Sequence, residues 1–361
     1  MPERVFNFSP GPATLPQEVL QQASKDILNY NNTGMGLIEL SHRSKDFMAV
    51  ADNTEKLLRE VFEIPDSYKV LFLQGGASTQ FAMVPMNLLG PSGKKATYLN
   101  TGTWSKKAIK EAKLFGEVDV AFSSEDSGFN HLPHDLDFSS ANSSEYLYFV
   151  SNNTIYGTQF TDMPKTEAIL VCDMSSDILS RKINVSDFGI IFAGAQKNMG
   201  PAGCTVVIIR EDLLDKAPAN LPTMFKYKTH SDKGSMFNTP PCFAIYVVGL
   251  VLQWLKDKGG VAAIEAQNNH KAKLVYDVID SSSFYRGHAN PDNRSMMNIT
   301  FNLPTPELEA QFISEALAID LNGLKGHRSI GGIRASIYNA FPVAGVEKLS
   351  DFMKEFETKN G

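Results

Sequence analysis

A lysine and an aspartate follow two buried strands of the sequence, at points where their side chains could act together. The apolar run 189–193 ends shortly before Lys197, and the run 168–173 ends at Asp173. Because ligands bind at the carboxyl ends of the strands in open α/β sheets, we expect both side chains at one site. A carboxylate there can keep a bound pyridine nitrogen protonated, which makes the ring an electron sink. Taken singly, a solvated loop lysine and a helix-capping aspartate are the more ordinary interpretations.

Two further features fit a cofactor with a pyridine ring and a phosphate. The glycine-rich segment 74–79 follows a predicted strand and opens a helix, and the free N–H groups of a helix N-terminus bind anions. Trp104 follows the next strand, where its flat ring could stack on a pyridine, although core packing is the commoner fate of a tryptophan. With Lys197 and Asp173, these features predict a site for pyridoxal 5′-phosphate (PLP).

Cationic side chains form a second group. His42-Arg43 and His327-Arg328 lie far apart in the chain, and Arg334 follows the second pair. Arginine binds carboxylates and phosphates with two parallel hydrogen bonds, and histidine adds a donor that titrates near neutral pH. One such pair would be an ordinary surface feature. Two pairs and a third arginine, in a chain of net charge −6, predict a pocket for a substrate with two anionic groups.

The composition indicates a globular protein of two domains. The chain has 361 residues, of which 43% are hydrophobic and 20% charged. Its negative charge and the lack of a basic run argue against nucleic-acid and membrane partners. The three cysteines show no metal-binding spacing and suit a reducing compartment. With no signal-peptide pattern and no apolar run of membrane-spanning length, we expect a cytoplasmic protein without a metal site.

The hydrophobic pattern predicts an α/β fold for the first part of the chain. Continuous apolar runs are typical of strands covered on both faces, and hence of a largely parallel sheet. Seven strands are expected, at residues 69–73, 96–100, 118–122, 146–150, 168–173, 189–193 and 205–210. Helices are expected at residues 53–62, at 104–115 and in a segment ending at 256, in which residues 238–241 supply a cap and prolines for the first turn.

The pattern changes after Gly259-Gly260, where we place a domain boundary. The remaining segment predicts a smaller α+β domain, with helices at 261–280, 306–318 and 345–358 and strands at 296–302 and 332–336. The proline-rich first residues are expected to form an extended arm. The predicted division is therefore an arm at 1–15 associated with the small domain, a large cofactor-binding domain at 16–258 and a small domain at 259–361.

Seven short motifs, in order along essentially the whole chain, carry a family resemblance. They lie at residues 7–13, 41–44, 74–78, 100–104, 172–176, 194–198 and 326–336. With them the chain resembles the phosphoserine aminotransferases, which belong to the class-V aminotransferases and to the fold-type I PLP enzymes. The segment 326–338 is very specific, whereas the glycine-rich turn alone would not be. The resemblance implies the fold-type I architecture, with a mostly parallel seven-stranded sheet and a C-terminal α+β domain.

The resemblance also implies roles at the cofactor. Lys197 would carry PLP, Asp173 would pair with its pyridine nitrogen, and Trp104 would stack on its ring. Thr154 would bind the 3′ oxygen. Ala77, Ser78 and Gln196 would hold the phosphate, and the neighbouring subunit of an obligate homodimer would complete that site with Asn238 and Thr239. The implied cofactor-binding residues are Ala77, Ser78, Trp104, Thr154, Asp173, Gln196, Lys197, Asn238 and Thr239.

For the substrates, the resemblance implies that Arg334 binds the α-carboxylate. The other implied substrate-binding residues are Ser9, His42, Arg43, His327 and Arg328, and the two His-Arg pairs form a distal site. That site would accept the phosphate of phosphoserine or the side-chain carboxylate of glutamate in turn. The implied reaction is transamination between glutamate and 3-phosphohydroxypyruvate in serine biosynthesis. 4-Phosphohydroxythreonine, in pyridoxine biosynthesis, is an implied second substrate.

Other functions leave some of these residues without a role. A cysteine desulfurase needs a nucleophilic cysteine on a mobile loop, whereas Cys172 lies on a predicted buried strand. A serine–glyoxylate aminotransferase has no use for four cationic side chains in a distal site. A nucleotide-binding dehydrogenase would need a G-x-G-x-x-G turn after a strand, which is missing. A non-enzymatic binding module would leave the lysine, acid, tryptophan and arginines without a common purpose.

Overall fold

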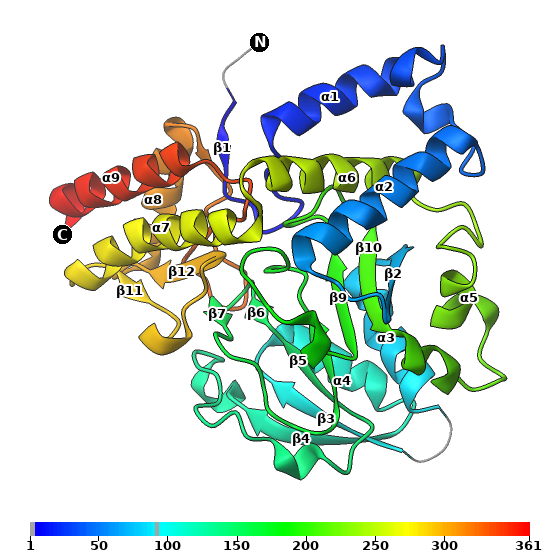
Figure 1. The fold of residues 1–361 in the computed structure, drawn as a ribbon. Coiled ribbons are helices and arrows are strands. Elements are labelled where there is room, and N and C mark those ends of the chain that lie inside the picture. The colour runs from blue at the N-terminus through cyan, green and yellow to red at the C-terminus, as the bar shows by residue number, and fades with distance from the viewer. Residues whose placement is uncertain (1–3, 91–93) are drawn as a thin grey trace.

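The computed structural model describes residues 4–90 and 94–361. It contains a large α/β unit and, beside it, a smaller α+β unit that includes the C-terminus (Figure 1). Seven strands form the sheet of the large unit, in the order β2-β10-β9-β8-β5-β3-β4. They are β2 (Tyr68–Leu73), β3 (Lys95–Asn100), β4 (Glu117–Ser123), β5 (Tyr146–Val150), β8 (Ile169–Asp173), β9 (Ile190–Gly194) and β10 (Thr205–Arg210).

The strand predictions are confirmed, and the sheet is mostly parallel. Only β10 runs antiparallel to its neighbours, β2 and β9. Alternate residues along β2 enter different cores, since Val70 and Phe72 belong to one hydrophobic cluster and Leu71 and Leu73 to another. Both faces of the sheet are thus covered, which explains the continuous apolar runs. The edge strand β4 is the exception, and Val120 there is 40% exposed.

Helices complete the two cores of the large unit. Residues of α1 (Gln17–Leu28), α2 (Lys45–Phe62) and α6 (Cys242–Asp257) enter one core, and residues of α3 (Gly76–Leu88) and α4 (Thr103–Ala112) enter the other. A short helix, α5 (Tyr227–Ser231), adds Tyr227 to the second core. The sheet therefore lies between two apolar layers of helices, which cover both of its faces.

Two predicted helix starts are wrong. Helix α2 begins at Lys45 rather than at residue 53, because the Ser44 hydroxyl caps it by accepting a hydrogen bond from the Phe47 N–H at 3.2 Å. Helix α6 begins at Cys242, after both prolines, so Asn238 and Thr239 do not cap it. The reason is steric, since a residue that precedes a proline is driven out of the helical conformation, and Pro240 precedes Pro241.

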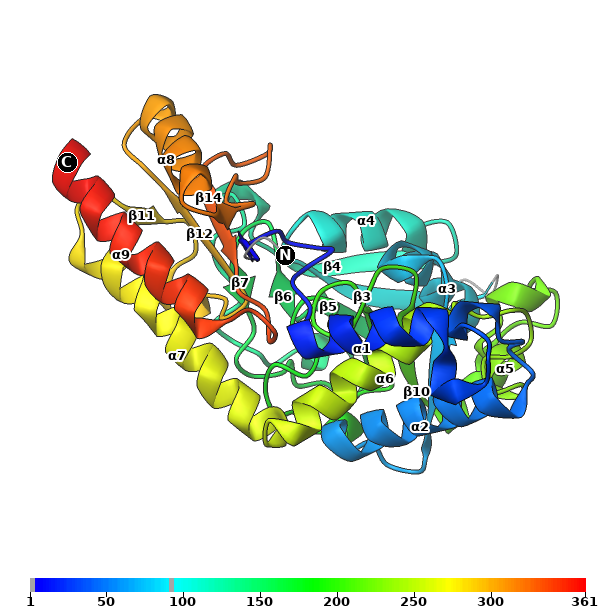
Figure 2. The same ribbon diagram turned by 90° about the horizontal axis from the view of Figure 1, so that it is seen from above.

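The small unit has a three-stranded antiparallel sheet in the order β11-β12-β14. Its strands are β11 (Arg286–Gly287), β12 (Asn298–Asn302) and β14 (Ile333–Ser336), and its helices are α7 (Gly260–Ser281), α8 (Pro306–Ala318) and α9 (Val343–Asn360). Helices α7 and α9 lie side by side (Figure 2). Helix α7 spans the junction of the two units, because Val261 and Ile264 pack into a core of the large unit and Val275 into that of the small one.

The N-terminal segment reaches the small unit before the chain enters the large one. Strand β1 (Phe6–Asn7) pairs in parallel with β13 (Leu321–Asn322), and Phe8 is fully buried in the core of the small unit. The chain then continues past the carboxyl ends of the large sheet, where the Ala13 N–H donates to the Gln196 carbonyl at 2.9 Å. The segment thus connects the two units.

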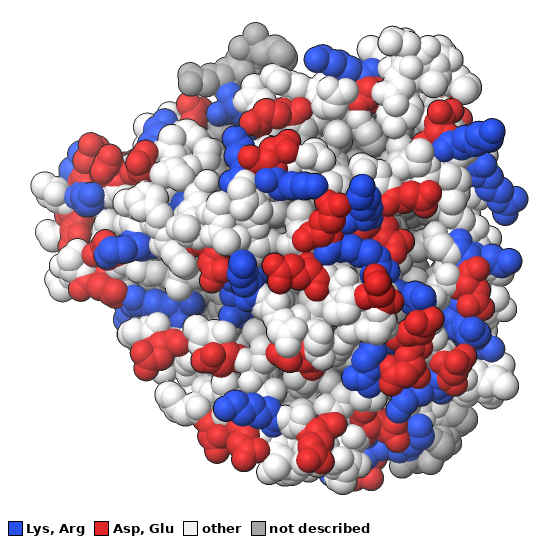
Figure 3. All heavy atoms as spheres, in the orientation of Figure 1, with Lys and Arg blue, Asp and Glu red and all other residues white. Residues whose placement is uncertain are grey.

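The surface carries both charges. On the face shown in Figure 3, lysines and arginines are interspersed with aspartates and glutamates. Within residues 4–90 and 94–361, no helix combines the length and the apolar character that crossing a membrane would require.

Candidate active site

A cavity of about 350 Å³ lies at the carboxyl ends of β5, β8 and β9, between the two units. Most of the predicted cofactor residues line it together with two of the predicted substrate residues. These residues are Ala77, Ser78, Trp104, Thr154, Asp173, Gln196, Lys197, His327 and Arg334. The large unit contributes the first seven and the small unit the last two. Residues far apart in sequence therefore meet where an α/β sheet is expected to bind its ligand.

Lys197 lies in the turn that follows β9, and its Nζ atom is 5.8 Å from the ring centroid of Trp104. Burial lowers the pKa of its ammonium group, while Asp173 raises that pKa and Arg334 lowers it further. A lysine with a lowered pKa is more often neutral at physiological pH, and the neutral amine is the nucleophilic and basic form. An amine in this state can bond to an aldehyde and can accept a proton.

Asp173 is the last residue of β8 and is 5% exposed. Its Oδ1 atom accepts a hydrogen bond from the Ser175 N–H at 2.9 Å. Burial raises the pKa of the carboxyl group, and Lys197 and the Ser175 hydrogen bonds oppose that rise. A buried carboxylate needs a cationic partner, and this one can serve either Lys197 or a protonated ring nitrogen in the cavity.

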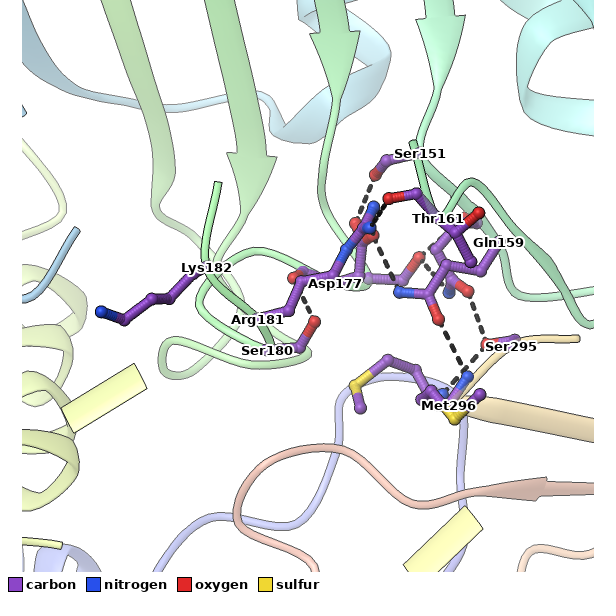
Figure 4. A network of polar contacts seen from close by, with 12 residues as sticks. Ser151, Gln159, Thr161, Asp177, Ser180, Arg181, Lys182, Ser295 and Met296 are labelled. Carbon is purple, nitrogen blue, oxygen red and sulfur yellow. Dashed lines mark hydrogen bonds and ion pairs between the residues drawn. The ribbon is translucent and has the colours of Figure 1, made fainter. Parts of the chain in front are cut away.

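A second buried carboxylate, Asp177, anchors the loop that begins at Asp173 (Figure 4). The Ser151 hydroxyl donates to Asp177 Oδ1, the Gln159 amide donates to Oδ2 at 3.1 Å, and Arg181 Nη2 lies 3.8 Å from Oδ2. Gln159 in turn accepts the Met296 N–H at 2.9 Å, next to β12 of the small unit. These bonds fix the cofactor edge of the sheet to the small unit.

Trp104 lies at the N-terminal end of α4, and its indole N–H has the partner that a half-buried indole requires. Nε1 donates to Thr154 Oγ1 at 3.1 Å. Thr154 follows β6 (Asn152–Asn153), which pairs with β7 (Thr158–Gln159) in a short hairpin. The hydrogen bond holds the indole plane in one orientation beside Lys197, so that it can pack against a flat ring.

The N-terminus of α3 forms another side of the cavity. Gly75 caps the helix with a φ of +94°, a conformation that favours glycine, and no side chain occupies the first free N–H groups. Ala77 and Ser78 are in this first turn, and Gln196 lines the same cavity. Free backbone N–H groups at a helix N-terminus suit the phosphate of a cofactor.

Arg334 is a buried cation with spare hydrogen-bonding capacity. It is 7% exposed on β14, and Nη1 donates to the Thr154 carbonyl at 3.1 Å. Its Nε atom is buried without a partner, and among the described residues no carboxylate forms an ion pair with it. Because a buried charge is costly when unpaired, Arg334 is suited to an anionic ligand.

His327 is the second contribution of the small unit to the cavity, from the loop before β14. Its Nδ1 atom is 2.7 Å from Ser329 Oγ. Burial lowers the pKa of the imidazole, and Arg334, Arg328 and Lys107 lower it further. The ring is therefore more readily neutral than a free histidine. A neutral ring beside cations can still donate a hydrogen bond, and it can gain a proton when a more highly charged anion binds.

Six predicted residues do not line this cavity within one chain. They are Ser9, His42, Arg43, Arg328, Asn238 and Thr239. The arm reaches the cavity with Pro10 and Gly11 instead of Ser9. Asn238 donates to Gln74 Oε1 at 3.2 Å and lines a separate cavity of about 240 Å³ on another side of the glycine-rich turn. Roles for these six residues remain predictions.

The structure also reveals lining residues to which the sequence assigned no role. Asn152, Ser175 and Ser176 line the cavity together with Asp173, and the Asn152 amide donates to Ser176 Oγ at 2.8 Å. Both serines belong to the motif 172–176. That motif predicted a functional loop but gave no information on which hydrogen bonds the serines form. Gly11 lies so close that a Cβ atom there would be 3.2 Å from Lys197 Cγ, and the motif 7–13 was its only signal.

Cys172 and Cys204 are not equipped for nucleophilic chemistry. Cys172 is fully buried, and burial raises the pKa of its thiol well above the ordinary range. Burial likewise raises the pKa of Cys204 to about 12. Since the thiolate is the reactive form, neither residue supports a desulfurase mechanism.

The site fits PLP on observations of its own residues. Lys197 can bond the cofactor, buried Asp173 can pair with a ring nitrogen, and α3 offers free N–H groups for the phosphate. The unpaired Nε atom of Arg334 leaves an anion-binding group on the remaining side. The arrangement can therefore hold a pyridine cofactor and present an amino acid's carboxylate to it.

Comparisons with known proteins agree with this reading. Residues 5–349 match the family "Aminotransferase class-V". The "Phosphoserine aminotransferase" of Desulfotalea psychrophila is 68% identical, over 100% of this chain and 99% of that protein. Among solved structures, the phosphoserine aminotransferase of Bacillus circulans subsp. alkalophilus is 48% identical with a TM-score of 0.95 and covers 99% of both chains. The "PLP bound" enzyme of Trichomonas vaginalis is 38% identical with a TM-score of 0.89, over 97% of this chain and 100% of that one.

Proposed function

Since the chain belongs to the phosphoserine aminotransferases, a family of class-V aminotransferases, we propose that it uses PLP to exchange an amino group between glutamate and 3-phosphohydroxypyruvate, giving O-phospho-L-serine and 2-oxoglutarate. The observation that carries the proposal is the meeting of Lys197, Asp173 and the unpaired Arg334 in one cavity. Such a reaction belongs to serine biosynthesis. The fold is that of the fold-type I PLP enzymes.

The residues of the cavity divide the task of holding the cofactor. Lys197 would bond it, Asp173 would pair with its ring nitrogen, and Trp104 would stack on the ring. Thr154 would bind the 3′ oxygen, and Ala77, Ser78 and Gln196 the phosphate. When bound, PLP supplies an electrophilic carbon and a ring that withdraws electrons from the substrate Cα.

The protein's own residues control the proton. Lys197 Nζ, whose pKa burial lowers, would take a proton from the substrate Cα in one half-reaction and give one to Cα in the other; within each half-reaction it would pass that proton to or from the cofactor, so the amine ends each half-reaction neutral. The negative charge of Asp173 would favour the protonated form of the cofactor's ring nitrogen. Arg334, which lines the same cavity as Lys197, would bind the α-carboxylate and so orient the substrate toward Lys197.

The distal end of the substrate would lie at the loop that carries His327 and Arg328. His42 and Arg43 do not line the cavity of their own chain, and the His42 Nε2 atom is buried without a hydrogen-bond partner. If the two pairs act on one phosphate, they must meet across a subunit interface. We therefore place His42 and Arg43 of one subunit at the site of the other.

A homodimer is proposed on the same ground. Asn238 and Thr239 do not line the cavity of their own chain, and Asn238 hydrogen bonds to Gln74 on the glycine-rich turn. From that position, the two residues of one subunit would complete the phosphate site of its partner. The sites would then be incomplete in an isolated monomer.

Three further assignments accompany this function. The arm 1–15, the large domain 16–258 and the small domain 259–361 are proposed as the working division, supported by the β1–β13 pairing and by separate cores. A cytoplasmic location is supported by three cysteines that are all free thiols. 4-Phosphohydroxythreonine, in pyridoxine biosynthesis, is the proposed second substrate, because its phosphate suits the same cationic loop.

An absorbance spectrum tests the function directly. The purified protein should absorb visible light through its bound cofactor, and adding phosphoserine or glutamate should convert that spectrum without a second substrate. Initial-velocity plots should be parallel, since each half-reaction uses one site and one substrate leaves before the other enters. A colourless protein that binds no PLP, or intersecting velocity plots, would contradict the proposal.

Replacing Arg43 with alanine tests the distal site. A charge-assisted arginine contact contributes roughly 1.5–3 kcal/mol, so kcat/KM for phosphoserine should fall about tenfold to a hundredfold. The neighbouring exposed residue Lys45 provides a control, and Lys45→Ala should leave kcat/KM unchanged. Unaltered phosphoserine kinetics in Arg43→Ala would remove Arg43 from the site.

The lowered pKa of Lys197 predicts how cofactor loading depends on pH. Bonding to an aldehyde needs the neutral amine, so the loading rate of cofactor-free protein should rise with pH. Because burial lowers this pKa from 10.5, the rate should level off at a lower pH than for Nα-acetyl-lysine measured in parallel. The Asp173 carboxylate raises the pKa, so Asp173→Asn should lower the midpoint further. A midpoint equal to that of the free amine would contradict the prediction.

A further inference from the structure

The loop of residues 326–332, here called the substrate loop, is closed tightly at its base. The Gly326 N–H donates to the Gly332 carbonyl at 2.9 Å, and the Gly331 N–H donates to the His327 carbonyl at 2.9 Å. A Cβ atom on Gly326 would lie 1.9 Å from the Gly331 carbonyl oxygen, so only glycine permits this approach. The direction in which His327 and Arg328 leave the base therefore depends on how the base itself is held.

Glu309, in the first turn of α8, holds that base. Its Oε2 atom accepts the Gly332 N–H at 3.0 Å. Its Oε1 atom accepts the Asn302 side-chain amide at 3.0 Å and the Leu303 N–H at 3.3 Å. One carboxylate thus connects the substrate loop to the end of β12. Hydrogen bonds to a charged acceptor are stronger than neutral ones, which suits a fixed anchor.

The opposite side of the loop rests on the large unit. Ile330 packs against a small cluster of Phe129, Ile155 and Tyr156, and Ile155 also lines the cavity. The loop therefore spans from the small unit to the large one beside the cavity, with a polar anchor at Glu309 and an apolar contact at Ile330. Strand β14 also has backbone contacts of its own, because Arg334 and Ile333 pair with Thr300 and Phe301 of β12.

We propose that Glu309 is a positioning residue for the substrate loop, which aims His327 and Arg328 at the distal anion of the substrate without touching it. The proposal rests on the function given above. In this proposal, Glu309 determines the position of His327 and Arg328, whereas the pairing of β12 with β14 determines the position of Arg334. Loss of Glu309 should therefore weaken substrate binding more than the chemical step.

The test compares Glu309→Ala and Glu309→Gln with the matched control Glu307→Ala. Glu307 is exposed in the same turn of α8, so its loss changes the charge of the helix N-terminus equally. For phosphoserine we expect Glu309→Ala to raise KM about tenfold with kcat within about twofold, the size of a lost charge-assisted hydrogen bond. Glu309→Gln keeps one acceptor oxygen and should fall between Glu309→Ala and the wild type.

Limited trypsin digestion gives a readout that needs no activity. Lys325 and Arg328 are exposed at the loop, and cleavage after either residue should accelerate at least about tenfold in Glu309→Ala, since cleavage follows the population of the opened segment. Cleavage elsewhere and the melting temperature should change no more than in Glu307→Ala. Inorganic phosphate at high concentration should slow the additional cleavage.

The outcomes separate the two proposals. A Glu309→Ala variant with the KM and the cleavage pattern of Glu307→Ala would overturn the positioning role, as would a fall in kcat at unchanged KM. If the wild-type protein fails to transaminate phosphoserine, the proposed function fails, and the tryptic comparison still decides whether Glu309 holds the loop. If Glu309→Ala does not fold, the same measurements on Glu309→Gln decide.

Discussion

Replacing Lys197 with alanine is expected to abolish the visible absorbance of the bound cofactor and to lower turnover by at least about a thousandfold. The methyl group cannot bond PLP, and it removes the base at Cα, whose contribution is roughly 10²–10⁴-fold for a positioned side chain. The lowered pKa that makes Lys197 reactive comes from its burial in the cavity, and an alanine at this position offers no amine there.

The measurement needs both a spectrum and a rate. Lys106, on the exposed surface of α4 and paired with Glu125, is a suitable control, and Lys106→Ala should keep the wild-type absorbance and turnover. A short primary amine added to Lys197→Ala should restore part of the activity if the missing group is the base. Undiminished turnover in the variant would refute the assignment of Lys197.

Replacing Asp173 with asparagine should lower kcat by about a hundredfold to a thousandfold, the cost of removing one preorganised electrostatic group from an active site. The change conserves volume and can keep the oxygen that accepts the Ser175 N–H, so the loop should stay in place. What disappears is the negative charge that would hold a proton on the ring nitrogen.

The loss of charge at Asp173 should be visible without turnover, as weaker cofactor retention during dialysis. Asp187, an exposed acid after β8, offers a control of the same chemistry, and Asp187→Asn should retain cofactor like the wild type. If Asp173→Asn kept both its cofactor and its rate, the carboxylate would have a structural role alone.

The strand positions, and the meeting of Asp173 and Lys197 at one edge of the sheet, were predictable because both depend on local pattern. The runs that became β8 and β9 are apolar throughout since both faces of the sheet are covered, and their ends placed Asp173 and Lys197. The N-cap of α6 was predicted wrongly because a cap and a diproline compete, and the sterics of Pro240 before Pro241 prevail.

Tertiary contacts were beyond the sequence for a different reason. Glu309 looks like an ordinary acid at a helix start, and only the return of the chain at Gly332 gives it a partner. The same holds for Arg334. Its Nε atom is buried without a hydrogen-bond partner on a strand that pairs with β12, and the sequence shows neither the burial nor the missing partner. His42 and Arg43 remain predictions, because their proposed partners lie on a second chain.

The pairing of β1 with β13 has a consequence for biosynthesis. Phe6 and Asn7 leave the ribosome long before Leu321 and Asn322, the residues with which they pair. Domains generally fold as units while synthesis proceeds, so the large sheet can assemble before β13 is available to pair with the arm. Pro10 and Gly11, which line the cavity, can settle only when the arm docks. The arm can therefore complete the pocket only after β13 has been translated, which delays a fully formed site until the small unit has emerged.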